Sequence, residues 1–293
     1  MGAALSASAR ATKRSARSKA ASSNPASGKR KRGSTPRLDE SALRTFGNRL
    51  RAWYRRNARD LPWRKTRDPY AILVSELMLQ QTQVSRVLEY WRRFLDRFPT
   101  LHHLADAHER EVLTAWQGLG YYARARNLHK LSRAVVREGA TAWGDVPPTP
   151  PTTIAAADAR GHGGQVPPFT TAADGTPSWL PAEAEKLRRL PGVGAYTAGA
   201  VSTFAFERRA SLVDTNVARV LARVFAPKLN PKRPRDLTVL WQIAEATLPR
   251  TGKATWTHNQ ALMELGALVC TARVKRCGAC PVRGVCKSVD DEA

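Results

Sequence analysis

The sequence predicts an all-α protein, and three observations support this prediction. Apolar residues recur at helical spacing over most of the chain from Asp39 onward. Start and stop signals punctuate these stretches, as at Asp68-Pro69, where an N-capping residue precedes a proline at the first helical position. No convincing segment alternates apolar and polar residues as a half-buried strand would. We therefore expect helices joined by turns and loops.

The first 38 residues are expected to form a disordered basic tail, because they hold ten basic residues, no acid and almost no large apolar side chain. The 293-residue chain carries 48 Lys and Arg against 24 Asp and Glu, a net charge of +24. Without the tail, 38 basic residues face 24 acidic ones, so the remainder still carries +14. Nucleic acid is the expected partner, ahead of an acidic membrane surface, and no apolar run is long enough to span a bilayer.

The first predicted helix has an apolar stripe that consists of Leu43, Phe46, Leu50 and Trp53, and it ends before Leu61-Pro62. A second begins at Asp68-Pro69, and helical spacing continues from Val84 to Phe98. Residues 144–181 break the pattern with eight prolines and five glycines, and are expected to form a loop or disordered insertion. Further helices are predicted near 108–117, 122–137, 182–190, 195–206, 214–226, 234–247 and 257–270.

A Gly-x-Gly turn lies between two predicted helices, where Gly192 and Gly194 flank Val193. Its backbone N–H groups, at the start of the next helix, can bind a phosphate without any side chain. A plain helix–helix connection is the alternative. Because Leu190-Pro191 precedes the turn and Tyr196-Thr197-Ala198-Gly199 follows it, the segment resembles the hairpin of helix–hairpin–helix DNA-binding proteins.

All four cysteines lie within 17 residues, in the pattern Cys270-x6-Cys277-x2-Cys280-x5-Cys286. A disulfide framework would spread its cysteines to join distant segments, so the clustering favours a metal or cluster site in a reducing compartment. Four thiolates can enclose one 4Fe–4S cluster or one zinc ion, and the ligand types do not separate the two. Two local disulfides are the alternative.

Asp214 directly precedes a predicted buried helix. An Asp in this position is usually an N-cap. That role is compatible with a catalytic one, since a capped carboxylate is fixed in position and held ionised. The apolar face of the helix consists of Val217, Val220, Leu221, Val224 and Phe225.

Glu76 lies among leucines in the segment SELMLQQTQV, residues 75–84. On a helix it shares a face with Ile72, Leu73, Leu79 and Gln80. Desolvation on such a face raises the pKa of a carboxyl group, which suits a general acid near neutral pH. A Glu paired with an Arg at a helix end is the alternative.

Together these features resemble the MutY-type adenine DNA glycosylases of the endonuclease III superfamily. The similarity runs from about Leu61 to Cys286, apart from the insertion. It is carried by LPWR (61–64), SELMLQQTQV (75–84), GLGYYARARNLHK (118–130), LPGVGAYTAGA (190–200), VDTNVARVLAR (213–223) and the four-cysteine loop.

The resemblance implies removal of adenine mispaired with 8-oxoguanine or guanine, by hydrolysis of the N-glycosidic bond. Glu76 matches the acid that protonates adenine N7 and later assists the attacking water. Asp214 matches the carboxylate that stabilises the cationic sugar, either electrostatically or as a covalent intermediate. Tyr196 and Asn216 match residues that orient these two groups. Bifunctional relatives carry a Schiff-base lysine where Tyr196 stands, so a monofunctional enzyme is expected.

The resemblance also implies a set of DNA contacts, since the target base must leave the helical stack. Gln81 and Thr82 match residues inserted at the lesion, and are expected to share one rigid helix end with Glu76. Tyr121 matches the wedge beside the opposing base, with a core aromatic as the alternative. Trp63 and Arg64 are expected to line the adenine pocket.

The implied fold is that of the helix–hairpin–helix glycosylases, in one domain over residues 39–290. A six-helix subdomain would span about 68–200 and contain the hairpin at 182–206. A second subdomain would combine about 39–67 with 207–269. The loop 270–286 would hold one 4Fe–4S cluster per chain through its four cysteines. The chain stops seven residues after Cys286, so a short form without the NUDIX-like domain of most members is expected.

Two other functions stay open, namely a related glycosylase for T:G mismatches or oxidised pyrimidines, and a catalytically inert, cluster-bearing DNA-binding protein. The expected partner is double-stranded DNA with a mispaired adenine. The protein is expected to be a monomer that does not associate with a membrane. The expected location is the bacterial cytoplasm, at the nucleoid, or the nucleus or mitochondria in a eukaryote. Lys29-Arg30-Lys31-Arg32 is similar to a nuclear signal, and the tail is similar to a transit peptide.

Overall fold

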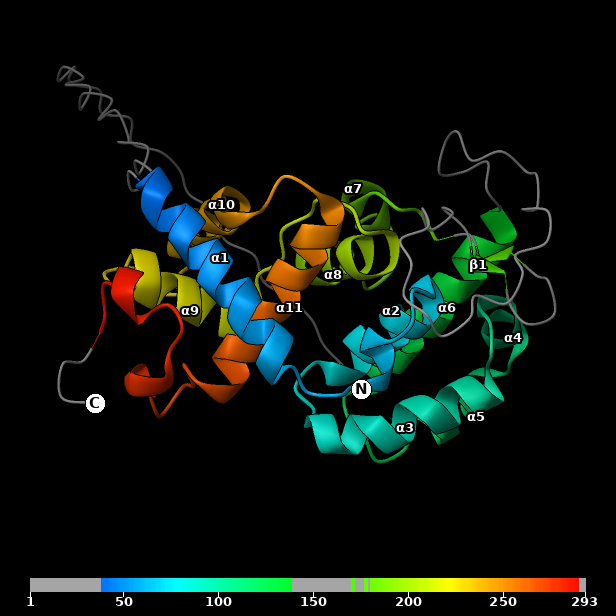
Figure 1. Cartoon of the computed structure of the whole chain (residues 1–293). Coiled ribbons are helices and arrows are strands. Elements are labelled where there is room, and N and C mark those ends of the chain that lie inside the picture. Colours follow the sequence, from blue (N-terminus) through cyan, green and yellow to red (C-terminus); the bar gives the residue numbers. More distant parts are fainter. Residues whose placement is uncertain (1–37, 139–169, 172–176, 179, 290–293) are drawn as a thin grey trace, which may run out of the picture. The chain divides into compact units, whose positions relative to one another are not determined.

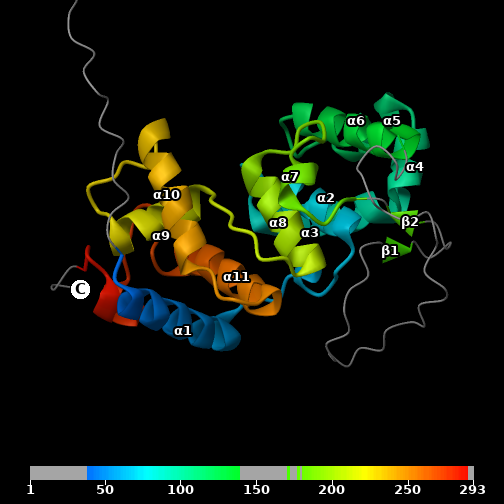
Figure 2. The same ribbon diagram turned by 90° about the horizontal axis from the view of Figure 1, so that it is seen from above.

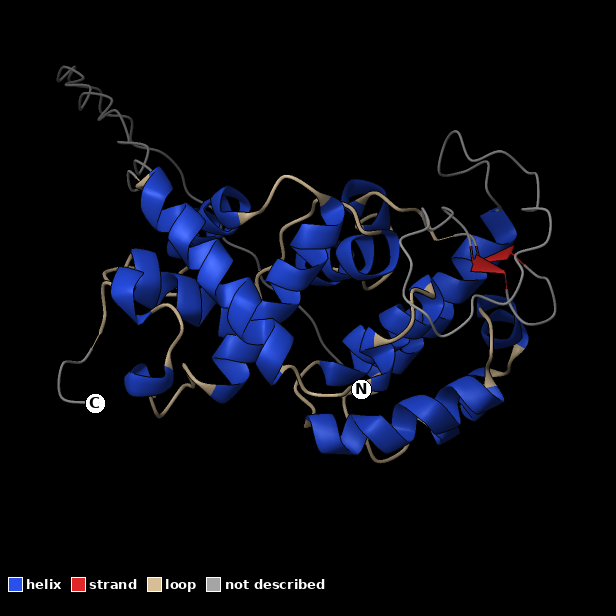
Figure 3. Cartoon of the chain, viewed as in Figure 1, coloured by secondary structure: helices blue, strands red, loops and turns tan. Residues whose placement is uncertain are grey.

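Helices form nearly all of the regular structure in this computed structural model, which confirms the predicted helical class (Figure 1, Figure 3). The structure describes residues 38–138, 170–171, 177–178 and 180–289. The chain divides into two units, Met1–Ser34 and Thr35–Ala293, and every described residue lies in the second. The predicted disordered tail and most of the insertion 144–181 therefore lie outside the described residues, apart from Leu38 and parts of 170–181.

One group of helices surrounds α2, which packs against α3, α6 and α8. Every residue of α2 from Pro69 to Met78 is buried, so the helix has no solvent-facing side. Glu76 therefore lies on a helix that is buried all round, beyond the single apolar face that the sequence predicted. The group comprises α2 (Pro69–Leu79), α3 (Val84–Arg97), α4 (Leu101–Asp106), α5 (Glu109–Ala115), α6 (Ala123–Glu138), α7 (Ala184–Leu187) and α8 (Ala195–Phe206).

A second group joins segments from both ends of the described chain (Figure 2). Helix α1 packs against α10 and α11, and α9 packs against the same two helices; α8 and α11 connect this group to the first. The group comprises α1 (Glu40–Asn57), α9 (Thr215–Phe225), α10 (Pro234–Thr247) and α11 (Gly252–Leu268). The described residues also include the short 3-10 turns η1 (Pro62–Arg64), η3 (Cys277–Ala279) and η4 (Arg283–Val285). The predicted subdomain boundaries stay a prediction.

Side-chain caps explain where several helices begin. Asp39 accepts hydrogen bonds from the backbone N–H groups of Ser41 and Ala42 at α1, and Asp68 accepts one from Tyr70 at α2. These bonds satisfy donors that a helix leaves unpaired at its first turn. The predicted start at Asp68-Pro69 is confirmed. None of the helices in the described ranges is both long and apolar enough to cross a membrane.

Four local features differ from the prediction. The helix α4 was not expected, and α11 begins at Gly252 instead of near 257, where Thr251 caps it by accepting from the N–H of Ala254. The insertion contains a short antiparallel pair of strands, β1 (Thr170–Thr171) and β2 (Pro177–Ser178), with Thr170 opposite Ser178. Gln81 and Thr82 do not lie on the helix of Glu76, because α2 ends at Leu79 and Gln81 adopts a left-handed φ of 57°.

Candidate active site

A cavity of about 780 Å³ is lined by both carboxylates that the sequence analysis singled out, Glu76 and Asp214. Its walls come from η1, the end of α2, the first turns of α8 and α9, and one face of α11. The predicted site residues that line it are Trp63, Arg64, Glu76, Gln81, Thr82, Gly192, Gly194, Tyr196, Asp214 and Asn216.

Glu76 combines deep burial with one hydrogen bond. Its side chain belongs to a residue that is 3% exposed, and the hydroxyl of Tyr196 donates to its Oε2 atom at 2.8 Å. Burial raises the pKa of Glu76 to about 7, against the opposing effect of the Tyr196 hydrogen bond. The Asp214 charge raises this pKa further and the Arg64 charge lowers it. Glu76 can therefore hold a proton near neutral pH, as the sequence predicted, and release it.

The raised pKa predicts that Glu76 destabilises the fold once it ionises. A carboxyl whose pKa is higher in the folded state stabilises the fold below its unfolded pKa, and this contribution is lost as pH rises through the folded value. Since Gln stays neutral, the stability of Glu76→Gln relative to wild type should increase by roughly 2 kcal/mol between pH 5 and pH 8. Urea unfolding of both proteins at the two pH values measures this difference. An equal difference at pH 5 and pH 8 would contradict the buried, raised-pKa state.

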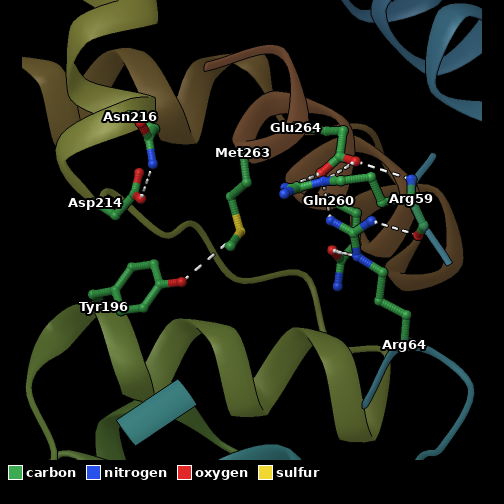
Figure 4. A network of polar contacts seen from close by, with 8 residues as sticks. All are labelled: Arg59, Arg64, Tyr196, Asp214, Asn216, Gln260, Met263 and Glu264. Atoms are coloured by element: carbon green, nitrogen blue, oxygen red, sulfur yellow. Dashed lines mark hydrogen bonds and ion pairs between the residues drawn. The ribbon is translucent and has the colours of Figure 1, made fainter. Parts of the chain in front are cut away.

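Asp214 caps α9 and is held by two donors. Its Oδ1 accepts from the backbone N–H of Val217 at 2.6 Å. Its Oδ2 accepts from Nδ2 of Asn216 at 3.0 Å, as Figure 4 shows. Burial raises the pKa of Asp214 above its usual value, while these two donors and the charge of Arg219 act to lower it. Desolvation outweighs the capping hydrogen bonds in the direction of this pKa shift, and the ionised state of Asp214 stays a prediction.

Asn216 is itself fixed by its neighbours. Nη2 of Arg219 donates to its Oδ1 at 2.8 Å, and α11 passes close by at Gly266. A Cβ atom at Gly266 would lie 2.7 Å from the Cβ of Asn216, so a larger residue there would displace one of the two helices. The amide of Asn216 is therefore held so that its Nδ2 points at Asp214.

One wall of the cavity, formed by α11 and the segment 59–64, contains a charged network that the sequence did not predict (Figure 4). Glu264 on α11 is fully buried and accepts from Nε and Nη2 of Arg59, both at 2.8 Å, and from Nη2 of Arg64 at 2.7 Å. Nε of Arg64 also donates to Oε1 of Gln260 at 2.8 Å. Burial alone would raise the pKa of Glu264, but the hydrogen bonds from Arg59 and Arg64 bring it down to about 2.

One sequence signal could have located this wall. Gln260 and Glu264 place two polar side chains about one turn apart on α11, yet both residues are buried. Buried polar groups need partners. The partner arginines lie about two hundred positions earlier in the chain, which no local pattern reveals.

Two of the three predicted DNA-probing residues line the cavity. Gln81 and Thr82 line it from the turn after α2. Tyr121 does not line it, and is 62% exposed in the loop before α6, with a left-handed φ of 47°. The alternative of a core aromatic at this position is therefore wrong.

The predicted hairpin is a tight turn in which only part of the backbone is free. Gly192 has a φ of 75°, and a Cβ atom there would lie 2.5 Å from Cβ of Asn127. Val193 is buried, and its N–H donates to the carbonyl of Leu190 at 3.2 Å, so this group is not available to a ligand. Gly194 precedes α8 without a side-chain cap, which leaves the first N–H groups of α8 as the available donors.

The four cysteines line a common cavity formed by α9, the end of α11 and the loop that follows it. None of the four is in a disulfide. Nη1 of Arg223 donates to Sγ of Cys270 at 3.3 Å, and the N–H of Ser288 donates to Sγ of Cys286 at 3.4 Å. Within the described ranges, no three His, Cys, Asp or Glu side chains are placed to hold a metal ion.

Residues 74–243 match the family model described as HhH-GPD superfamily base excision DNA repair protein. An adenine DNA glycosylase of Rattus norvegicus is 38% identical over 259 residues, covering 85% of this chain and 43% of that protein. An adenine DNA glycosylase of Mycobacterium tuberculosis is 40% identical over 237 residues, covering 80% of this chain and 64% of that protein. The chain thus spans less than half the length of its mammalian relatives.

Solved structures show the same arrangement of helices. A thermostable thymine-DNA glycosylase is 25% identical with a TM-score of 0.65, and the match covers 85% of this chain and 96% of that one. An endonuclease III trapped on DNA is 20% identical with a TM-score of 0.61, covering 86% and 97%. At that identity the second likeness concerns the fold alone.

Proposed function

Because the chain belongs to the HhH-GPD superfamily of base excision DNA repair proteins, we propose that it removes adenine mispaired with 8-oxoguanine or guanine from double-stranded DNA. The observation that carries this proposal is the buried Glu76, whose pKa is raised to about 7, in the same cavity as the capped Asp214. The greater identity to adenine glycosylases, 38–40% against 25% to the thymine enzyme, favours adenine as the target.

The first step of the proposed reaction is protonation of the leaving base. Adenine leaves deoxyribose poorly until its ring is protonated, so the carboxyl proton of Glu76 passes to N7. The Tyr196 hydroxyl occupies Oε2 of Glu76 and leaves Oε1 without a partner among the described residues, so the proton can face the cavity. The C1′–N9 electron pair then leaves with the base, as in glycoside hydrolysis generally.

The second step is capture of the cationic sugar by water. The carboxylate of Asp214, oriented by Val217 and Asn216, stabilises the positive charge that develops at C1′. A water molecule then adds to C1′ and gives a proton to the carboxylate of Glu76, which restores the acid. The products are free adenine and an abasic sugar in an intact strand.

DNA binding would use the rim of the cavity and the hairpin. Gln81, Thr82 and Tyr121 would fill the space that the extruded adenine leaves in the duplex. The uncapped start of α8 beside Gly192 and Gly194 would bind a backbone phosphate. The +14 charge outside the tail supports DNA as the ligand, bound by one copy of the chain.

The four cysteines line one cavity, and we propose that they hold a 4Fe–4S cluster, as the resemblance to the MutY-type glycosylases implies. A 4Fe–4S cluster takes one thiolate per iron and so suits sulfurs spread around a cavity. Cys270, Cys277, Cys280 and Cys286 would hold it, and the Arg223 donor on Cys270 would stabilise thiolate charge. The cluster would cross-link the loop 270–286 and so fix its conformation.

Base excision from duplexes that differ only in their mispair tests the proposed activity against the related glycosylase activities. Wild-type protein is incubated at fixed salt with duplexes carrying A:8-oxoguanine, A:G or T:G, and abasic sites are revealed by alkali. Adenine excision from the first two at rates well above thymine excision supports the proposal. Faster processing of T:G, or of an oxidised pyrimidine duplex, would replace it with the related glycosylase activity.

Tyr196→Lys should add strand cleavage to base removal. A lysine at this position would reach the same sugar carbon from the first turn of α8, and its amine can form a Schiff base with C1′. Covalent trapping with borohydride should therefore capture a protein–DNA adduct with the variant and not with wild type. If wild type already nicks DNA without alkali, or the variant gains no adduct, the monofunctional mechanism assigned to Tyr196 is wrong.

A further inference from the structure

A single buried guanidinium connects two of the proposed DNA-probing segments. Arg124 lies on α6, and the residue is only 8% exposed. Its Nη1 donates to the carbonyl of Leu77 at 2.8 Å, to that of Met78 at 2.9 Å, and to that of Gln80. These are carbonyl groups at the C-terminal end of α2, where the helix leaves acceptors unpaired and a positive charge is favourable.

The other nitrogen of the same fork reaches both segments. Nη2 of Arg124 donates to Oγ1 of Thr82 at 3.2 Å, and to the carbonyl groups of Leu119 at 3.3 Å and Gly120 at 3.1 Å. The guanidinium also lies 5.4 Å from the ring centre of Tyr121. The turn after α2 and the loop before α6, some forty positions apart in sequence, thus share one donor group.

Both segments hold an unfavourable backbone conformation beside this contact. Gln81 and Tyr121 have φ angles of 57° and 47°, and among described non-glycine residues only Glu207 also has a positive φ. Left-handed conformations are costly for L-residues and persist where the surroundings hold them. Arg124 donates to groups next to both strained residues. It bonds to Gln80 and Thr82, which flank Gln81, and to Gly120, which precedes Tyr121.

We propose that Arg124 is a positioning residue that joins the Gln81–Thr82 turn and the Tyr121 loop into one rigid wedge. The two probes then enter the duplex together, on opposite sides of the gap left by the extruded base. The role requires arginine, because a planar fork can serve two segments at once, whereas a lysine ammonium is a single point. The inference rests on the proposed glycosylase function and assigns Arg124 no contact with the reacting atoms.

The test separates base extrusion from chemistry. In a Glu76→Gln background, which removes the acid, a 2-aminopurine beside the mispaired adenine reports extrusion by its fluorescence. Arg124→Lys is compared with Arg126→Lys, a matched change two positions along α6 at an exposed arginine paired with Glu109. Arg124→Lys should reduce the extruded fraction about tenfold, while Arg126→Lys should leave it unchanged. Affinity for an undamaged duplex should be equal in the two variants.

A second measurement keeps the proposal testable if Arg124→Lys folds poorly. Gln81→Ala, Tyr121→Ala and the double variant are compared in the same assay with Arg124 intact. If one wedge is at work, the double variant loses about as much extrusion as either single variant.

Two results would overturn the coupling, namely additive losses in that cycle, or equal extrusion by Arg124→Lys and Arg126→Lys. If wild type releases adenine in either case, the proposed function stands and only the role of Arg124 falls. If wild type releases no adenine from any duplex, the proposed function itself is wrong.

Discussion

Glu76→Gln is expected to lower the single-turnover rate of adenine release by about 10³-fold or more, while DNA binding is retained. The amide has the shape of the carboxyl group and can still accept from the Tyr196 hydroxyl, which lies 2.8 Å from Oε2. It has no proton to give to the leaving base, and no carboxylate to receive one from water. Rapid-quench kinetics with excess protein on an A:8-oxoguanine duplex measures the rate, and fluorescence anisotropy measures the affinity.

The matched control for this change is Glu89→Gln on α3. Glu89 is exposed, pairs with Arg93 at 3.2 Å and does not line the cavity. Its rate should equal that of wild type. The loss in Glu76→Gln should accompany a gain in stability at pH 8, so a global unfolding cannot explain it. An undiminished rate in Glu76→Gln would rule out Glu76 as the acid. If neither wild type nor Glu89→Gln releases a base, the inert DNA-binding alternative is favoured.

Asp214→Asn is expected to lower the same rate by about 10²- to 10³-fold, because the sugar cation loses its facing negative charge. The cap should survive, since an Asn side-chain oxygen can accept from the N–H of Val217 as Asp214 does at 2.6 Å. Thermal unfolding should show only a small decrease, because an amide nitrogen cannot accept the bond that Nδ2 of Asn216 donates to Oδ2 of Asp214, and duplex affinity should persist. The rate is measured under single-turnover conditions, as for Glu76→Gln.

The control for Asp214→Asn is Asp236→Asn. Asp236 also lies in the first turn of a helix, α10, and accepts from the N–H of Asn230 at 2.9 Å, but it does not line the cavity. The two variants share a similar change in charge and in helix-end chemistry, and only Asp214→Asn should lose activity. A rate within a few-fold of wild type would show that Asp214 acts as a cap alone.

The sequence predicted helices well where caps and apolar stripes agree. Asp68 and Asp214 fix the starts of α2 and α9 through local hydrogen bonds, which a few neighbouring residues determine. Helix α4 was missed because its six residues carry too short a stripe to show periodicity. The left-handed Gln81 was missed because no local turn signal marks it, and the contact beside it, from Arg124 to the carbonyl of Gln80, joins positions more than forty apart.

The sequence predicted the two carboxylates of the candidate site, Glu76 and Asp214, but not the cavity wall that contains Glu264. Glu76 stands out in the sequence as an acid within an apolar helix. Glu264 becomes recognisable as part of the site only in the folded structure, where it forms ion pairs with Arg59 and Arg64. The motif YYARARNLHK contains Arg124 and Arg126, two positions apart and therefore on different helix faces. The sequence does not distinguish the buried arginine from the exposed one, because that difference depends on packing against α2 and the loop at 118–120.

Adenine release from a duplex with adenine opposite 8-oxoguanine tests the proposed function most directly. Wild-type protein in excess is incubated with the duplex, free bases are identified by mass spectrometry, and the strand is analysed before and after alkali. The expected result is one free adenine per duplex, with a strand that breaks only after alkali. An intact duplex with no free adenine, or a strand cut before alkali, would contradict hydrolysis by Glu76 and Asp214.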